Sequence, residues 1–92
     1  MEQTTVTIYD GEMAIYDHVP AWIQVDNPMS WRGHLLAAEG QLFMTSGMNT
    51  SHPVRFFLKT VEGQGGEVII GAVNTQTREV HFEGKGPFGP LQ

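Results

Sequence analysis

Histidines are the side chains of this protein best suited to acid–base or metal chemistry, and the sequence scatters them. They stand at four separate places, His18, His34, His52 and His81. Two metal ligands on one face of a strand would be two residues apart, because successive side chains point to opposite faces. No two of these histidines have that spacing. The sequence therefore predicts surface or loop histidines and no metal site, and it leaves open a cluster that the fold itself assembles.

Carboxylates stand close to two of the histidines. Asp17 directly precedes His18, but adjacent residues of a strand point to opposite faces, so we expect no working carboxylate–imidazole pair there. Glu79 and Glu83 flank His81 at strand spacing, which places all three side chains on one face and is typical of a solvated, charge-balanced surface. We expect neither group to perform acid–base catalysis.

Nucleophiles and phosphate-binding loops form no convincing pattern. The chain has no cysteine, which excludes thiol chemistry and Cys-based zinc sites. It also lacks a Gly-x-Ser-x-Gly motif, and Gly63-Gln64-Gly65-Gly66 is not followed by the helix whose N-terminus would bind a phosphate. We therefore predict a protein that is not an enzyme and needs no cofactor. A hydrolase that uses unrecognised carboxylates is the weakest alternative.

Aromatic residues give the few positive signals. Trp22 and Trp31 are expected to anchor the core, because a small barrel needs large side chains to fill it. The alternative is a platform on which a ligand stacks. Phe57 stands at strand spacing between Arg55 and Lys59, an outward aromatic between two cations that could stack a nucleic-acid base. The formal net charge of −5 opposes phosphate binding, so we predict no nucleic-acid partner.

Two further apolar groups are candidate contact surfaces. Phe57, Ile69 and Val73 are expected to form a strip on the outer face of a C-terminal sheet, which the N-terminal strands or a partner would cover. Phe88 and Leu91 lie among glycines and prolines near the end of the chain. Either they pack back on the mouth of a barrel or they reach a neighbouring subunit as an apolar hook.

The elements that would position these residues are predicted to be strands, beginning with a hairpin over residues 4–16. Asp10-Gly11 separates two alternating runs there, which is a strong signal for a two-residue turn. Such a turn pairs Tyr9 with Glu12. One face of the hairpin then carries Val6, Ile8, Met13 and Ile15.

A meander of three strands is predicted over residues 54–83, with turns at 62–66 and 74–78. Alternating apolar residues place one face of this sheet against a core. The expected pairs across it are Leu58–Ile70, Phe57–Gly71 and Ile70–Phe82.

The middle of the chain is harder to assign. Residues 22–25 form an apolar run that predicts a strand, and residues 30–39 fit either a strand or a short helix. Glycines bracket the second segment closely, so we favour a strand over 31–37. A further strand over 41–45 and a polar loop over 46–53 are expected to follow.

Length and composition indicate one domain with a short tail. Ninety-two residues fit a single β domain over 1–83, and the segment 84–92 holds three Gly and two Pro, from which we expect no regular structure. The chain starts without a basic and apolar leader, and its apolar runs are too short to cross a bilayer. We therefore expect a cytoplasmic protein with no membrane partner.

Taken together, the patterns predict an all-β fold, a small antiparallel barrel or sandwich of about seven to eight short strands. The predicted function is a non-enzymatic interaction module that binds itself or another protein, because a small core gains stability by association. The alternative is a small-molecule-binding barrel. Its mouth or sheet face would be lined by Trp22, Trp31 and the loop 46–53.

Overall fold

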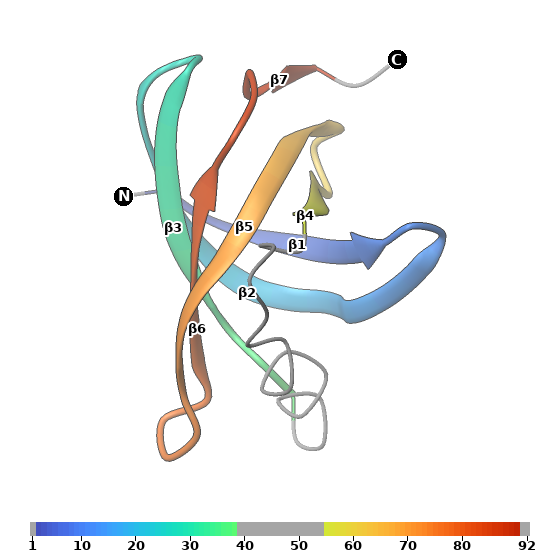
Figure 1. Cartoon of the computed structure of the whole chain (residues 1–92), viewed down its shortest axis with the longest axis vertical. Helices are drawn as coiled ribbons and strands as arrows, with labels where there is room; N and C mark the ends of the chain where they lie inside the picture. The colour runs from blue at the N-terminus through green and yellow to red at the C-terminus, as the bar shows by residue number, and fades with distance from the viewer. Residues whose placement is uncertain (1, 39–54, 91–92) are drawn as a thin grey trace.

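A computed structural model describes residues 2–38 and 55–90 of the chain. The described residues form seven strands and no helix (Figure 1). The strands are β1 (Glu2–Asp10), β2 (Met13–Asn27), β3 (Ser30–Leu36), β4 (Arg55–Thr60), β5 (Gln64–Asn74), β6 (Glu79–Gly84) and β7 (Gly89–Pro90). The predicted all-β class is confirmed. Within the same residues no helix has the length and apolar character needed to span a bilayer.

Six of the strands close into an antiparallel barrel. β1, β2 and β3 form one meander, and β4, β5 and β6 form a second. The two meanders join along both sides, through β1 with β4 and β3 with β6, while β7 adds to β5 as an extra strand. The structure thus selects the barrel from the two predicted architectures, and it confirms the C-terminal three-stranded meander.

The first hairpin forms where it was predicted but in a different register. Asp10 pairs with Met13, so the two loop residues are Gly11 and Glu12. Gly11 has a φ of 63°, a left-handed conformation that glycine adopts without strain. The predicted pair of Tyr9 with Glu12 is therefore wrong. Met13, expected on the buried face, is 61% exposed.

Two bulges in β2 explain why its side chains do not alternate. The register with β1 shifts on both sides of the pair Ile8–Tyr16, and each shift inserts one extra residue in β2. Consequently Ile15 and Tyr16 are both buried, and Asp17 and His18 are both exposed. In β1 the predicted inward residues Val6 and Ile8 are both buried, although Thr7 between them is buried as well, and in β2 the predicted alternation fails.

The pairing of β4 with β5 differs from the prediction by four residues. Because this is an even number, each side chain keeps its predicted side of the sheet. Leu58 is buried and Phe57 is exposed, as their alternation predicts. The observed pairs are Leu58–Gly66 and Phe57–Glu67, in place of Leu58–Ile70 and Phe57–Gly71.

The pairing of β5 with β6 is confirmed at one end and shifted at the other. Ile70 pairs with Phe82 as predicted. A bulge follows, and Val73 then pairs with Val80. The bulge turns Val73 inward, where it packs against the core.

The middle and the tail also differ in part from the sequence-based expectations. The strand expected over 31–37 is confirmed by β3. The strand expected over 41–45 and the loop over 46–53 lie outside the described residues. Gly89–Pro90 pairs with Gln64 and Gly65 of β5, so the expectation of a tail without regular structure is wrong for these two residues.

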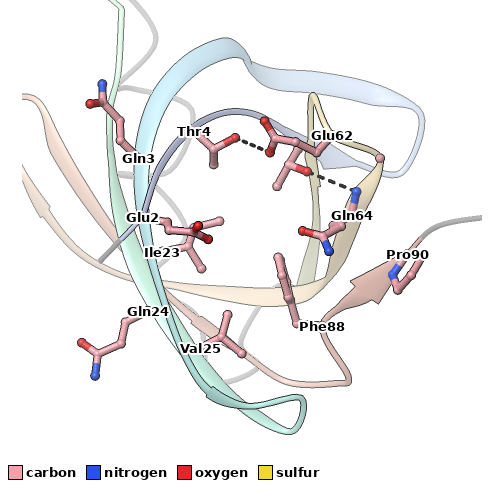
Figure 2. A pocket seen from close by; sticks show the side chains of 12 residues that line it. Glu2, Gln3, Thr4, Ile23, Gln24, Val25, Glu62, Gln64, Phe88 and Pro90 are labelled. Atoms are coloured by element: carbon pink, nitrogen blue, oxygen red, sulfur yellow. Dashed lines mark hydrogen bonds between the residues drawn. The ribbon is translucent and has the colours of Figure 1, made fainter.

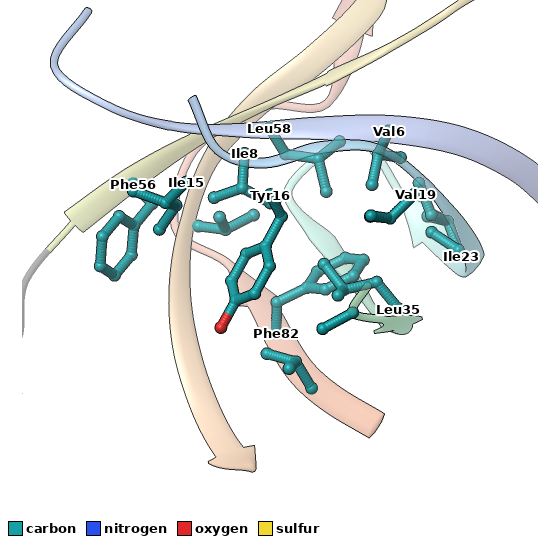
Figure 3. Close-up of a cluster of buried hydrophobic side chains, with 14 of the residues drawn as sticks. Val6, Ile8, Ile15, Tyr16, Val19, Ile23, Leu35, Phe56, Leu58 and Phe82 are labelled. Carbon is teal, nitrogen blue, oxygen red and sulfur yellow. The ribbon is translucent and has the colours of Figure 1, made fainter. Parts of the chain in front are cut away.

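Apolar side chains from all six barrel strands fill the interior (Figure 3). Among the described residues no buried side-chain nitrogen or oxygen lacks a hydrogen-bond partner. A filled interior leaves a ligand or partner to bind at an end of the barrel or on its outer face. The largest fully buried side chains are Tyr16, Ile8, Leu35, Leu58, Val6, Val68 and Val80.

Candidate functional site

A hollow lies at one end of the barrel, and we call it the mouth (Figure 2). It is open to solvent, with a volume of about 990 Å³. Its apolar floor includes Ile23 at 5% exposure, together with Val25 and Phe88. The volume lies at the upper end of the range of small-molecule pockets. The mouth is therefore large enough for a ligand of that class.

Phe88 reaches the mouth because Trp31 holds the C-terminal tail against the barrel. The Trp31 indole is 3% exposed, and its N–H donates a hydrogen bond of 2.8 Å to the carbonyl of Gly86. Its ring lies 4.8 Å from the Phe88 ring, between centroids. The backbone N–H of Phe88 donates to the carbonyl of Pro28 at 2.8 Å. Phe88 thus follows the first of the two alternatives for the tail and packs back on the mouth. Leu91 lies outside the described residues.

Carboxylates, hydroxyls and three carboxamides, those of Gln3, Gln24 and Gln64, form the polar rim of the mouth. Thr4 Oγ1 donates a 2.6 Å hydrogen bond to Glu62 Oε1, and the backbone N–H of Gln64 donates to Thr60 Oγ1 at 3.1 Å (Figure 2). Glu2 supplies a second carboxylate. The described residues that line the mouth include no Lys, Arg or His. The electrostatic character of the mouth is therefore negative.

The outer face of the barrel carries a row of rings that the sequence did not predict. Trp22 pairs with His34 across β2 and β3, and His34 pairs with His81 across β3 and β6. Trp22 and His34 stack at 5.1 Å with planes 15° apart, and the two imidazoles lie 5.5 Å apart. Glu79 Oε1 lies 3.1 Å from His81 Nε2. The fold thus gathers two scattered histidines, although the described chain holds no group of three or more candidate ligands for a metal ion.

The two tryptophans have different environments. Trp31 lies in the core as predicted. Trp22 is only half-buried, because its neighbours Ala21 and Ile23 take the inward positions of β2. The expectation of a core anchor is therefore confirmed for Trp31 and wrong for Trp22. Neither ring lines the mouth, which has a different set of residues from the one expected for a ligand site.

Asp17 and His18 form a pair that the sequence analysis excluded. The second bulge of β2 places both side chains outside the barrel, where Asp17 Oδ1 lies 2.6 Å from His18 Nδ1. His18 has a φ of 52°, and its backbone N–H donates to the buried Thr7 Oγ1 at 3.2 Å. The side chains are 59% and 71% exposed, so water solvates this pair on the outer surface.

The predicted strip of Phe57, Ile69 and Val73 is not continuous. Val73 packs against the core, while Phe57 on β4 and Ile69 on β5 are diagonal neighbours on the outer face. Lys59 is exposed two residues beyond Phe57, and Arg55 pairs with Ile69. Two members of the strip thus remain available for an outside contact.

A shallow groove lies beside Phe57, and we call it the Phe57 groove. Phe57 is 40% exposed. Pro87 and Pro90 of the tail and glycine backbone of β5 complete the groove, which has a volume of about 380 Å³. The groove is therefore largely apolar.

Comparisons of the chain with protein-family models, with curated proteins and with solved structures found no match. The inference of function accordingly depends on the residues described above.

Proposed function

We propose that the protein is a non-enzymatic binding module and that the mouth of its barrel holds a small molecule. The mouth combines an apolar floor, Ile23 and Phe88, with a rim of carboxylates, hydroxyls and carboxamides. Small-molecule sites use such a combination to bury the body of a ligand and to fix its orientation. This arrangement is the observation that carries the proposal.

The position of the carboxylate–imidazole pairs supports a non-enzymatic role. Two such pairs occur in the described part of the chain, Asp17–His18 and Glu79–His81. Both are on the outer face and neither borders the mouth. A general base would have to lie within hydrogen-bond reach of a bound substrate, and these imidazoles do not lie beside the proposed binding site.

Val25→Trp is expected to block the mouth. Val25 is 44% exposed and lines the mouth, so an indole there would fill space that a ligand needs without disturbing the core. In a titration of the 15N-labelled protein with a library of small polar compounds, ligands should shift the amide signals of Thr4 and Gln64. These shifts should disappear in Val25→Trp.

Met13→Trp is the matched control, because Met13 is 61% exposed and does not line the mouth. It should leave ligand shifts unchanged. Ligand shifts that survive equally in both variants, or that map to another face of the barrel, would contradict binding at the mouth.

Self-association through the Phe57 groove is a second candidate function. An exposed aromatic ring beside two prolines is a favourable contact surface. A 92-residue domain gains stability when association buries more of its apolar surface. Phe57→Glu should lower the oligomeric mass and leave the β circular-dichroism spectrum intact. Val61→Glu is the control, at an apolar residue that is more exposed than Phe57 and lies outside the groove. An unchanged mass, or loss of the fold, would count against this interface.

Native mass spectrometry of protein purified under mild conditions discriminates between the two candidates. A clean multiple of the chain mass favours the Phe57 groove. A monomer with additional mass that denaturation removes favours the mouth.

A further inference from the structure

The composition of the mouth restricts the chemistry of its ligand. We propose that the mouth takes a small organic cation, an ammonium group carried on an apolar or aromatic body. This inference rests on the proposed binding function and deepens it. It excludes as preferred ligands both anions and neutral polyols.

The mouth carries negative charge. Glu2 and Glu62 both line the mouth, and the described lining residues contain no Lys, Arg or His. Two carboxylates attract a positive ligand and repel a negative one. The whole chain carries a formal net charge of −5, which adds a weaker long-range attraction in the same direction.

Hydrogen-bond directions at the rim also bear on the ligand. The Thr4 hydroxyl donates to Glu62 and the backbone N–H of Gln64 donates to Thr60, so these two donors have partners within the protein. The carboxamides of Gln3, Gln24 and Gln64 also line the mouth and can both donate and accept; that of Gln24 donates to Asp26 Oδ1 at 3.1 Å. The second oxygen of Glu62 and the carboxylate of Glu2 are acceptors only. An ammonium group, whose N–H groups only donate, can therefore bind these carboxylate oxygens, whereas the carboxylate of an anionic ligand cannot.

The floor of the mouth suits an apolar body. Phe88 is half-buried beside Trp31 and presents part of its surface to the mouth, where Val25 and Ile23 flank it (Figure 2). An apolar body can pack on these side chains, and a cation attracts the face of an aromatic ring. A sugar or other polyol would leave the aliphatic part of this floor without a complementary surface.

Three probes that share one body test the inference: phenethylammonium, 2-phenylethanol and 3-phenylpropionate. In 15N NMR titrations at low salt, phenethylammonium should shift the amides of Thr4, Gln64 and Phe88. It should bind about tenfold more tightly than 2-phenylethanol, because two carboxylates line the mouth. The difference should shrink severalfold in 0.5 M NaCl, because salt screens exposed charges. Phenylpropionate should bind most weakly.

Glu62→Gln isolates the charge, since the amide oxygen can still accept the hydrogen bond from Thr4. It should weaken phenethylammonium binding about threefold and leave 2-phenylethanol binding unchanged. Glu12→Gln removes one exposed carboxylate at the far hairpin and should change neither affinity. A double variant with Glu2→Gln and Glu62→Gln should abolish the preference for the cation.

The outcomes separate the inference from the proposed function. Equal affinities for the three probes at the mouth, or tightest binding of the anion, would overturn the cation preference and leave the mouth a binding site. An effect of Glu12→Gln as large as that of Glu62→Gln would also overturn it, because net charge alone would then be responsible. If no probe shifts the amides of the mouth, both the inference and binding at the mouth fail.

Discussion

Gly33→Ala is expected to destabilise the barrel by about 3 kcal/mol or more, a large effect for the addition of a single methyl group. Gly33 is buried in the middle of β3, between Ile23 on β2 and Phe82 on β6. A Cβ atom there would overlap the backbone oxygen of Trp22 and would lie 2.8 Å from the Phe82 ring. Backbone cannot rotate away as a side chain can, so the strands themselves would have to separate.

Thermal unfolding followed by circular dichroism measures this effect. For a domain of this length the midpoint should fall by roughly 12–24 °C. Gly71→Ala provides the control, because Gly71 is exposed at the bulge of β5 and a Cβ there meets only the His81 carbonyl oxygen, at 3.6 Å. That variant should be neutral or slightly more stable, since alanine restricts the unfolded chain. Equal midpoints for the two variants would contradict the close approach of strands at Gly33.

The alternation of apolar and polar residues was sufficient to predict where the strands lie and, for most of them, which face is buried. Alternation correctly placed Leu58 inside and Phe57 outside even though their partners on β5 were wrong, because an even slip preserves the face. A shift by an odd number of residues moves side chains to the opposite face, and each bulge in β2 and β5 introduces such a shift. Val73 was misplaced for that reason. Met13 pairs with the exposed Asp10, an even shift of two residues from the predicted register, so its exposure follows from its position at the tip of the hairpin. The sequence of a strand carries little signal for where a bulge occurs.

Contacts between the two meanders could not be predicted, because they join strands that are distant in the sequence. His34 and His81 come together only through the pairing of β3 with β6, and no spacing rule applied to one strand detects them. The placement of Trp22 had a usable signal. Pro20 and Gln24 lie two residues before and after Trp22 and point to the same face of β2, whereas Val19, Ala21 and Ile23 point to the other face. The face with Pro20 and Gln24 is the more polar one, which indicated that the Trp22 ring points outward.

The mouth was missed because the tail completes it. Gly and Pro content argued for an irregular end, but the same residues allow the chain to follow the barrel closely. Where Gly84 and Gly66 pass the Trp31 ring, a Cβ on Gly84 would overlap the indole, and one on Gly66 would lie 2.9 Å from it. The glycines therefore make room for the side chain that holds the tail. Because the tail depends on Trp31, replacing this residue is the second change with a large expected effect.

Trp31→Ala is expected to cost about 3–5 kcal/mol of stability and to release the tail from the mouth. The substitution removes a nearly fully buried indole, leaves the Gly86 carbonyl without its 2.8 Å donor, and takes away the ring on which Phe88 packs. Trp22→Ala changes the same residue type on the outer face, where the ring is half-buried against His34. It should cost only about 1–2 kcal/mol, because most of the truncated surface already borders water.

Chemical denaturation measures the two costs, and the amide signals of residues 86–90 report the tail. Trp31→Phe separates packing from hydrogen bonding: it retains a buried ring and loses the donor to Gly86, so it should cost about 1–3 kcal/mol and leave Phe88 close to the barrel. If Trp31→Ala proved no more destabilising than Trp22→Ala, the tail would not depend on the indole. If residues 86–90 kept their signals in Trp31→Ala, the pairing of β7 with β5 would hold the tail without it. The expected loss of both stability and tail order follows from one cause, because the side chain that fills the end of the core is also the one that binds the residues forming the floor of the mouth.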